Sequence, residues 1–397
     1  MRRLGTALLT LALSAAGCSG SAGTGATTTT VGPAPTSVGS TTLPPTSAPA
    51  TTSTTTTTPP PTTITTTTAP VDVPRLARAV LMVGLAGSGI GETVAAHLAA
   101  GGLGILLLGD DIGTAAQVRS LTREASCAAA GPLLIAVDQE LGVVARLRGL
   151  VTALPSTGEA LEMTPEELEI TGQLLGDEML ALGINVDFAP VLDVVAGPNP
   201  ALQGRHLGAD PAVVAELGLA FWRGLELAGV IAVPKHFPGH GRAAADPHDQ
   251  VARVGAPLAD LRAMDFPPFS AAVAAGARAI MVGHPVYGAL DPDLPASISP
   301  VILALLRDDF GFEGVAITDA LNMAGVAAGR DPGDLAVAAL AAGEDLLLVV
   351  DPAQIERTTA AIVAAVATGR LPLERLQEAA ARVRALAAAA APVACNA

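Results

Sequence analysis

The residues best suited to chemistry are concentrated in one short segment, from Val233 to His248. Lys235 is the only lysine in the chain, so every other permanently cationic side chain is an arginine. A lysine ammonium is a compact point charge with rotatable donors, whereas a guanidinium is a planar fork, so the two are not interchangeable. Three of the six histidines, His236, His240 and His248, fall within the same segment. This concentration of titratable groups predicts a catalytic or binding site.

Asp246 and His248 have the spacing of an acid/base pair. Residues i and i+2 of an extended segment face the same side, and Pro247 disfavours a helical backbone at Asp246. An imidazole titrates near neutrality, so it can donate a proton and then accept one. It also adds no second negative charge beside an anionic nucleophile, as an ionised glutamate would. The alternative interpretation is that Asp246-Pro247-His248 is only a turn.

The elements that must position these residues are visible as eight short apolar runs. Each run has the length of a strand and lacks the stripe of an amphipathic helix, which is typical of buried parallel strands. The runs cover residues 79–85, 104–108, 133–137, 185–192, 230–233, 279–282, 314–317 and 345–350.

Amphipathic segments rich in Ala and Leu separate these runs. Several open with a capping residue followed by proline, which is favoured at the first position of a helix. These pairs are Thr164-Pro165, Asp210-Pro211, Ser299-Pro300, Asp331-Pro332 and Asp351-Pro352, and Glu167 completes a capping box with Thr164. Alternating β and α units predict an α/β fold, a single-domain (β/α)8 TIM-type barrel. A doubly wound open sheet is the alternative, but no Gly-x-Gly-x-x-Gly follows the first run.

A barrel of this kind places its active site at the carboxyl ends of its strands. Polar residues follow the third to the seventh runs in this chain: Asp138, Asp193, Lys235 with His236, His284, and Asp319. Only 15% of the residues are charged. We therefore expect these side chains to meet at one rim of the barrel.

Several classes of function are disfavoured. The net charge is −15, and phosphate binding needs Lys and Arg clustered on one face, so we expect no nucleic-acid partner. His236 and His240 lie on a Gly-Pro loop rather than on one helix face, so no specific metal motif is present. No Gly-x-Ser-x-Gly elbow indicates a serine hydrolase. Carboxylates and hydrogen-bond donors in a barrel mouth suit a polyhydroxylated substrate such as a sugar.

The N-terminus has the features of an export signal. Arg2 and Arg3 precede an apolar stretch that is too short to span a bilayer permanently. Residues 15–18, Ala-Ala-Gly-Cys, resemble the lipobox of bacterial lipoproteins. The resemblance implies a signal peptide over 1–17, lipidation of Cys18 and anchoring to the outer face of the cell membrane; an ordinary secretory signal is the alternative. Residues 18–70 are rich in Thr and Pro, and from residue 19 on they carry no charge, which predicts a disordered linker before a catalytic domain over 71–391. Whether Cys127 and Cys395 pair is left open, because export permits a disulfide without requiring one.

Blocks of sequence in the predicted barrel resemble glycoside hydrolase family 3, in particular its single-domain β-N-acetylglucosaminidase branch. The resemblance rests on residues 233–241 (Val-Pro-Lys-His-Phe-Pro-Gly-His-Gly) with Asp246-x-His248, 134–140 (Leu-Ile-Ala-Val-Asp-Gln-Glu), 185–194, 295–300, 311–321 and 342–345. The blocks occur in order across nearly the whole barrel. The chain departs from the family pattern at Leu141 and Val143, at Pro247 and at Arg242.

The resemblance implies a role for each matching residue. Asp319 would be the nucleophile that forms a glycosyl-enzyme, and His248 the acid/base, oriented by Asp246. Five further residues would hold the N-acetylglucosamine unit: Asp138, Arg146, Arg205, Lys235 and His236. The implied enzyme is a retaining exo-β-N-acetylglucosaminidase acting on peptidoglycan-derived glycans or muropeptides, without a metal or organic cofactor, and we expect a monomer.

Three other interpretations remain open. A phosphorylase would use the same residues with phosphate as acceptor. A metal-dependent hydrolase would use His236, His240 and His248 as ligands. A non-catalytic lipoprotein would only bind wall glycans.

Overall fold

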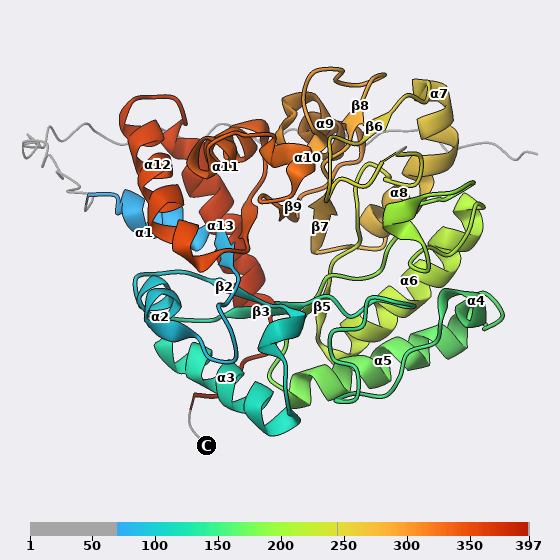
Figure 1. Cartoon of the computed structure of the whole chain (residues 1–397), viewed down its shortest axis with the longest axis horizontal. Helices are drawn as coiled ribbons and strands as arrows, with labels where there is room; N and C mark the ends of the chain where they lie inside the picture. Colours follow the sequence, from blue (N-terminus) through green and yellow to red (C-terminus); the bar gives the residue numbers. More distant parts are fainter. Residues whose placement is uncertain (1–69, 244, 396–397) are drawn as a thin grey trace, which may run out of the picture. The chain divides into compact units, whose positions relative to one another are not determined.

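The computed structural model describes residues 70–243 and 245–395 (Figure 1). The predicted signal peptide, Cys18 and all but the last residue of the predicted linker lie outside these residues. Among the helices of the described part, none combines the length and the apolar character that a membrane span requires.

The described residues form a parallel sheet of eight strands in the order β5-β4-β3-β2-β1-β10-β9-β7. Within this sheet, strands that follow one another in the sequence lie side by side, and the last strand, β10, pairs with the first, β1. The strands are β1 (Leu81–Val83), β2 (Gly104–Leu107), β3 (Leu134–Val137), β4 (Val186–Asp187), β5 (Ile231–Ala232), β7 (Ala279–Val282), β9 (Val315–Ala320) and β10 (Leu346–Val349). Each lies within or overlaps one of the eight apolar runs.

The residues that follow β5 join the two edges of the sheet. The amide of Phe237 donates to the carbonyl of Met281 (2.8 Å), and the amide of Met281 donates to the carbonyl of Pro234 (3.0 Å). The amide of Gly283 donates in turn to the carbonyl of Phe237 (3.0 Å). These bonds bring β5 and β7 together and confirm the predicted (β/α)8 TIM-type barrel.

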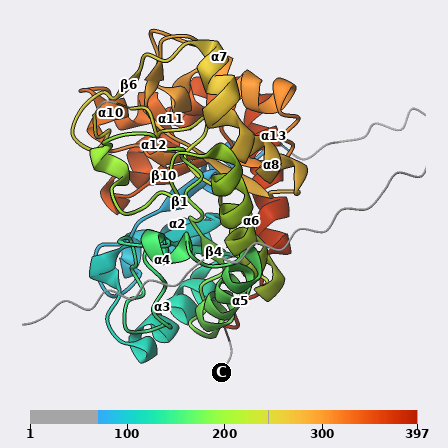
Figure 2. The same cartoon turned by 90° about the vertical axis from the view of Figure 1, so that its right-hand side faces the viewer.

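Helices surround the sheet, and α5 and α6 lie side by side in both views (Figures 1 and 2). Their bounds are α1 (Val73–Ala79), α2 (Gly91–Ala99), α3 (Ala115–Ala128), α4 (Thr157–Ala160), α5 (Pro165–Ala181), α6 (Pro211–Ala228), α7 (Leu258–Asp260), α8 (Phe266–Ala274), α9 (Pro300–Ala304), α10 (Ala324–Ala327), α11 (Pro332–Ala342), α12 (Ile355–Ala367) and α13 (Leu373–Ala389). A small parallel pair, β6 (Arg253–Val254) with β8 (Val286–Tyr287), is separate from the barrel.

The predicted caps begin these helices. Thr164 Oγ1 accepts from the amide of Glu167 (3.2 Å) and Glu167 Oε2 accepts from the amide of Thr164 (2.8 Å), which is the predicted capping box of α5. Asp210, Ser299 and Asp331 cap α6, α9 and α11. The pair Asp351-Pro352 instead opens a 3-10 turn, η6 (Pro352–Gln354), that leads into α12.

Two apolar layers hold the barrel together. Met82, Leu106, Phe188 and Ile317 belong to a cluster that packs side chains from the strands against one another. The strand residues that alternate with these, such as Ile105, belong to a second, larger cluster together with side chains of the helices. The interior is therefore filled by apolar side chains, most of them aliphatic, and the charged groups of the site lie at the rim.

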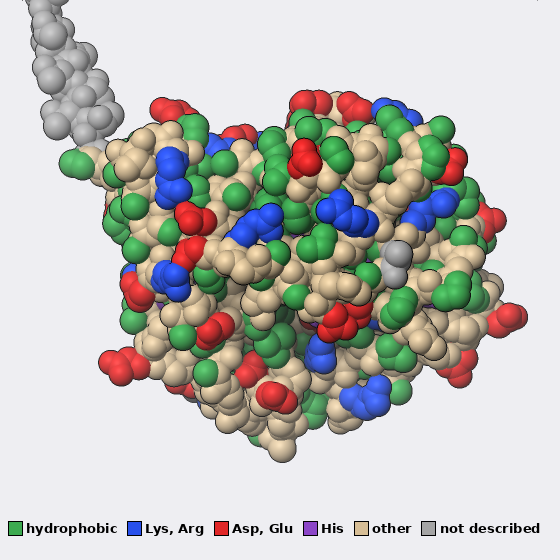
Figure 3. Space-filling model, turned by 45° about the horizontal axis from the view of Figure 1, so that its top comes forward, with side chains coloured by type: hydrophobic (Ala, Val, Ile, Leu, Met, Phe, Trp, Pro, Cys, Tyr) green, Lys and Arg blue, Asp and Glu red, His purple; other side chains and the backbone are tan. Residues whose placement is uncertain are grey.

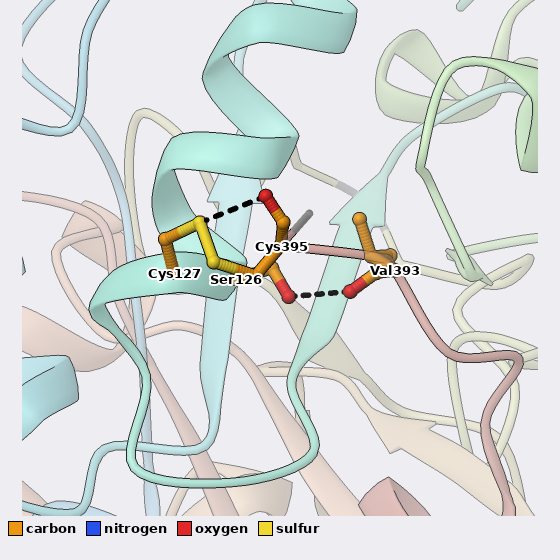
Figure 4. The surroundings of a disulfide bond; sticks show 4 residues. All are labelled: Ser126, Cys127, Val393 and Cys395. Atoms are coloured by element: carbon orange, nitrogen blue, oxygen red, sulfur yellow. Dashed lines mark hydrogen bonds between the residues drawn. A yellow bond between two sulfur atoms is a disulfide. The ribbon is translucent and has the colours of Figure 1, made fainter. Parts of the chain in front are cut away.

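The C-terminal segment is tied to the body of the barrel. Cys127 of α3 and Cys395 form a disulfide, with their Cα atoms 4.8 Å apart. Figure 4 shows the segment passing beside α3, where the Ser126 hydroxyl donates to the carbonyl of Val393. Asn185, just before β4, also donates to the carbonyl of Ala391 (2.9 Å). The pairing that the sequence left open is thus formed in the structure.

Candidate active site

A cavity of about 290 Å³ opens where the strands end, as the barrel prediction requires. Seven of the eight residues proposed for catalysis or substrate binding line it: Asp138, Arg146, Arg205, Lys235, His236, His248 and Asp319. The eighth, Asp246, contacts His248. The structure therefore brings the predicted site residues together from the segments after β3, β4 and β5, and from β9.

Lys235 is buried between two carboxylates. Its Nζ lies 2.6 Å from Asp138 Oδ1 and 2.6 Å from Glu140 Oε1. Burial alone would lower the pKa of Lys235, but the two carboxylates outweigh it and raise that pKa. The ammonium is thus held charged at one fixed point of the wall. A guanidinium could not occupy this compact position with the same geometry.

Glu140 links the lysine to an arginine. Arg205 donates to both oxygens of Glu140, from Nε at 2.8 Å and from Nη2 at 2.7 Å. Burial would raise the pKa of Glu140, but Lys235 and Arg205 together lower it to about 2. Two cations and two carboxylates, counting Asp138, therefore form one rigid charged network beside the cavity.

His236 is oriented by a buried carboxylate. Asp193 Oδ2 lies 2.7 Å from His236 Nδ1, and Asp193 Oδ1 accepts from the amide of His240 (2.6 Å). Burial would raise the pKa of Asp193, but the two histidines and these hydrogen bonds lower it. An ionised Asp193 keeps the proton of His236 on Nδ1, which leaves Nε2 for the cavity.

The histidines do not gather as the metal-dependent interpretation requires. Asp193, His236 and His240 are the group whose ligand atoms lie within 4.8 Å of one another, and His248 is not part of it. His248 is instead bonded to Asp246. A metal at the first group would also have to displace the hydrogen bond between Asp193 and His236, because that carboxylate is already engaged.

Asp319, the residue predicted to be the nucleophile, lies near the end of β9. Its Oδ1 accepts from the amide of Ala320 (2.7 Å). Burial would raise the pKa of Asp319, but the charges of His284 and His236 and the Ala320 hydrogen bond lower it to about 2. The carboxylate is therefore ionised at any ordinary pH. His284 is fixed by Ser297 Oγ (2.7 Å) and by the carbonyl of Ala320 (3.0 Å).

Asp246 and His248 form the predicted contact. Asp246 Oδ1 lies 2.7 Å from His248 Nδ1 and accepts from the His248 amide at 2.9 Å. Burial would raise the pKa of Asp246, but these hydrogen bonds to His248 and its charge lower it. Because Asp246 is an acceptor, His248 presents Nε2 to its surroundings. The imidazole is 61% exposed, so water and substrate can both reach it.

The loop that carries this pair is fastened at both sides. Arg242 Nε donates to the buried Asp265 Oδ2 (2.7 Å), and the amide of Gly325 in α10 donates to the carbonyl of Pro247 (2.8 Å). A Cβ at Gly325 would meet that carbonyl at 2.8 Å, so the close approach requires glycine. Arg242, a departure from the family pattern, is thus an anchor of the loop.

Some functional candidates were not proposed from the sequence. Asp193 was expected only at the rim, and Glu140 only as part of the block 134–140, yet a buried lysine and a buried histidine both need carboxylate partners. Asn322 and Met323 also line the cavity, and no feature of the sequence singled them out.

Comparison with known proteins agrees with this architecture. The model of the family described as "Glycosyl hydrolase family 3 N terminal domain" matches residues 77–386. The beta-hexosaminidase A of Pseudoalteromonas piscicida is 34% identical over 311 residues, which are 70% of this chain and 52% of that protein. This chain thus spans about half the length of that relative.

Two solved structures are similar in both fold and sequence. A family 3 beta-N-acetylglucosaminidase from Paenibacillus sp. FPU-7 superposes with a TM-score of 0.78 at 33% identity, covering 81% of this chain and 63% of that one. A beta-N-acetylhexosaminidase from Beutenbergia cavernae gives a TM-score of 0.74 at 31% identity, covering 81% of this chain and 100% of that one.

Proposed function

The chain belongs to glycosyl hydrolase family 3 and is a glycosidase, and from this premise we propose that it is a retaining exo-β-N-acetylglucosaminidase. One observation carries the proposal. An ionised carboxylate on β9 and an imidazole on the loop after β5 line the same cavity of about 290 Å³. The cavity therefore supplies both a nucleophile and a separate proton donor, the two groups that a retaining mechanism needs.

In the first half of the reaction, Asp319 attacks the anomeric carbon and the bond to the leaving oxygen breaks. His248 Nε2 gives its proton to that oxygen, so the aglycone leaves as a neutral alcohol. The amide of Ala320 holds one Asp319 oxygen (2.7 Å) and leaves the other free to attack. The pKa of about 2 keeps Asp319 anionic without a base to activate it.

In the second half, water replaces the aglycone and attacks the glycosyl-aspartate. The now neutral imidazole of His248 accepts a proton from this water, and Asp319 is released as a carboxylate. Asp246 stabilises the imidazolium whenever His248 carries both protons, because it lies 2.7 Å from Nδ1. The exposure of the imidazole allows water to reach it.

The remaining residues hold the sugar. Lys235, Arg205 and Asp138 present fixed donors and acceptors that suit the hydroxyl groups of a pyranose. His236, oriented by Asp193, faces the cavity with Nε2. Because these groups are locked by one another, little conformational entropy is lost when the sugar binds.

Turnover of 4-nitrophenyl N-acetyl-β-glucosaminide by wild type and by Asp319→Ala tests this proposal. We expect roughly a 10⁴-fold or greater loss of kcat in the variant. Asp308→Asn, an exposed aspartate outside the cavity, is the matched control and should keep full activity. Full activity in Asp319→Ala would contradict the proposal. Sugar 1-phosphate in phosphate buffer would indicate phosphorolysis instead of hydrolysis.

We further propose that the substrate is a peptidoglycan-derived N-acetylglucosaminide and that the monomeric enzyme works outside the cell membrane, anchored through lipid on Cys18. The sequence features at residues 1–18 support the anchor. Partition of the expressed protein between detergent and water tests it. Wild type should enter the detergent phase and Cys18→Ala should stay in water; equal partition of the two would refute the anchor.

A further inference from the structure

The segment that follows β7 contacts the supports of both reacting groups. We call residues 283–299 the β8 strap, because the short strand β8 lies within them. The strap contains most of the block 295–300, one of the blocks that resemble family 3, and the proposed mechanism gives that block no role. It also contains Tyr287, the only tyrosine of the chain, which is fully buried.

His284 of the strap fixes the end of β9, where the nucleophile lies. Its Nε2 lies 3.0 Å from the carbonyl oxygen of Ala320, and because a carbonyl only accepts, Nε2 carries the proton. Its Nδ1 lies 2.7 Å from Ser297 Oγ, so the buried ring is held on both sides. The amide of the same Ala320 donates to Asp319 Oδ1 (2.7 Å). His284 therefore acts on the nucleophile through Ala320.

Tyr287 of the strap fixes the start of the acid/base loop. Its hydroxyl donates to the carbonyl of Gly239 (2.9 Å). The other end of the loop is held by β8 itself, which pairs with β6, and the amide of Val286 donates to the carbonyl of Ala252 (2.9 Å). The loop that carries His248 therefore begins and ends on the strap.

The strap is braced internally. The amide of Ser297 donates to the carbonyl of Gly283 (3.1 Å). Asp291 Oδ2 accepts from the hydroxyl of Ser299 (2.6 Å), and the amide of Asp291 donates to the carbonyl of Tyr287 (2.9 Å). These bonds tie the end of the strap to its beginning, so its two outward contacts are held by one rigid element.

We propose that the β8 strap sets the separation between the nucleophile and the acid/base group, with His284 and Tyr287 as its two positioning residues. A retaining mechanism needs the two groups at a defined distance across the glycosidic bond. A displacement of about 1 Å can cost on the order of 10²-fold in rate. The inference rests on the proposed function, because it takes Asp319 and His248 as the reacting groups.

Two glycosides with different leaving groups separate the two positioning roles. A dinitrophenyl N-acetyl-β-glucosaminide has a leaving group that needs no proton, whereas the disaccharide of N-acetylglucosamine has one that does. In Tyr287→Phe, which frees the acid/base loop, we expect kcat/KM to fall about tenfold on the disaccharide and less than about twofold on the dinitrophenyl glycoside. In His284→Met, which frees the nucleophile, kcat/KM should fall roughly 10- to 100-fold on both substrates alike. His284→Gln, whose amide nitrogen can donate in place of Nε2, should recover most of that loss.

A matched control removes a buried hydroxyl elsewhere. Thr359→Val on α12 removes one whose oxygen bonds to none of the described residues, and it should change neither value. Urea unfolding of each variant shows whether its fold is intact. If His284→Met does not fold, Ser297→Ala replaces it, because it removes one of the two partners of the ring and should also lower kcat/KM equally on both substrates.

The outcomes separate this inference from the proposed function. An unchanged kcat/KM in Tyr287→Phe, or equal losses on the two substrates in that variant, would overturn the inference and leave the glycosidase proposal standing. So would a loss in His284→Met that is confined to the disaccharide, or a His284→Gln no more active than His284→Met. A wild type that cleaves neither substrate would refute the proposed function, and this inference with it.

Discussion

Acid should weaken the fold through His97, a buried histidine on α2. His97 is 0% exposed, and neither ring nitrogen has a hydrogen-bond partner among the described residues. Burial, together with the nearby charge of Arg78, lowers the pKa of His97 from 6.5 to about 4. Between these two values the unfolded chain binds a proton that the folded chain excludes. Stability is therefore complete above about pH 6.5 and falls as the pH falls.

The size of this effect follows from the same two values. The pKa of His97 falls from 6.5 to about 4, and each pKa unit corresponds to about 1.4 kcal/mol. The full loss of unfolding free energy is therefore about 3 kcal/mol. At about pH 5 roughly 2 kcal/mol of it has been lost. That is a substantial fraction of the stability of an ordinary domain. Because the pKa of Asp319 is about 2, we expect acid inactivation to begin with unfolding rather than with titration of the nucleophile.

Urea unfolding of wild type and His97→Leu at about pH 7.5 and pH 5 measures this contribution. Leucine cannot titrate, so the variant should lose roughly 2 kcal/mol less than wild type between the two pH values. The comparison of differences cancels the other titrating groups. If wild type and variant lose the same stability on acidification, the account of His97 is wrong.

Three further predictions concern other buried groups. Lys235→Met should raise KM and cost about 3 kcal/mol of unfolding free energy, because Glu140 loses a buried partner; unchanged KM and stability would contradict the network. Asp265→Asn, which weakens the anchor to Arg242 (2.7 Å), should reduce kcat by about tenfold on disaccharides but much less on an aryl glycoside whose leaving group needs no proton; equal losses would indicate a merely structural role. Burial raises the pKa of Glu344 well above its usual range, so the folded chain keeps a proton that the unfolded chain releases. Glu344→Gln should therefore lose less stability than wild type as the pH rises, and parallel unfolding curves from pH 6 to 9 would count against this.

The fold could be predicted because its signal is local. A strand that is buried on both faces must be apolar throughout, and β7 occupies residues 279–282, the apolar run predicted for it. β4 is shorter than its run, since only Val186–Asp187 pair regularly before the chain reaches Pro190, which has no amide hydrogen to donate. The joining of β5 to β7 uses backbone groups of Pro234 and Phe237, which lie beyond the apolar run of β5, so the hydrophobic pattern cannot reveal it.

The site could be predicted where a residue type is rare in the chain or where two titratable residues have a specific spacing. The lone lysine and the Asp246–His248 spacing pointed to residues that the structure brings into contact with the cavity or with each other. The disulfide depends on where the C-terminal segment returns, and only the structure shows that it passes α3 (Figure 4).

The face drawn in Figure 3 mixes acidic and basic side chains. The charged groups of the site include buried ones such as Glu140. Their burial depends on packing, which composition does not reveal.

Trapping of the covalent intermediate would show whether Asp319 is the nucleophile. A 5-fluoro N-acetylglucosaminyl fluoride slows hydrolysis of a glycosyl-enzyme, so the intermediate accumulates and can be weighed by mass spectrometry. We expect one added sugar per chain, located by peptide mapping on Asp319 and absent from Asp319→Ala. Turnover of the fluoride with no mass added, or a sugar attached to another residue, would contradict it.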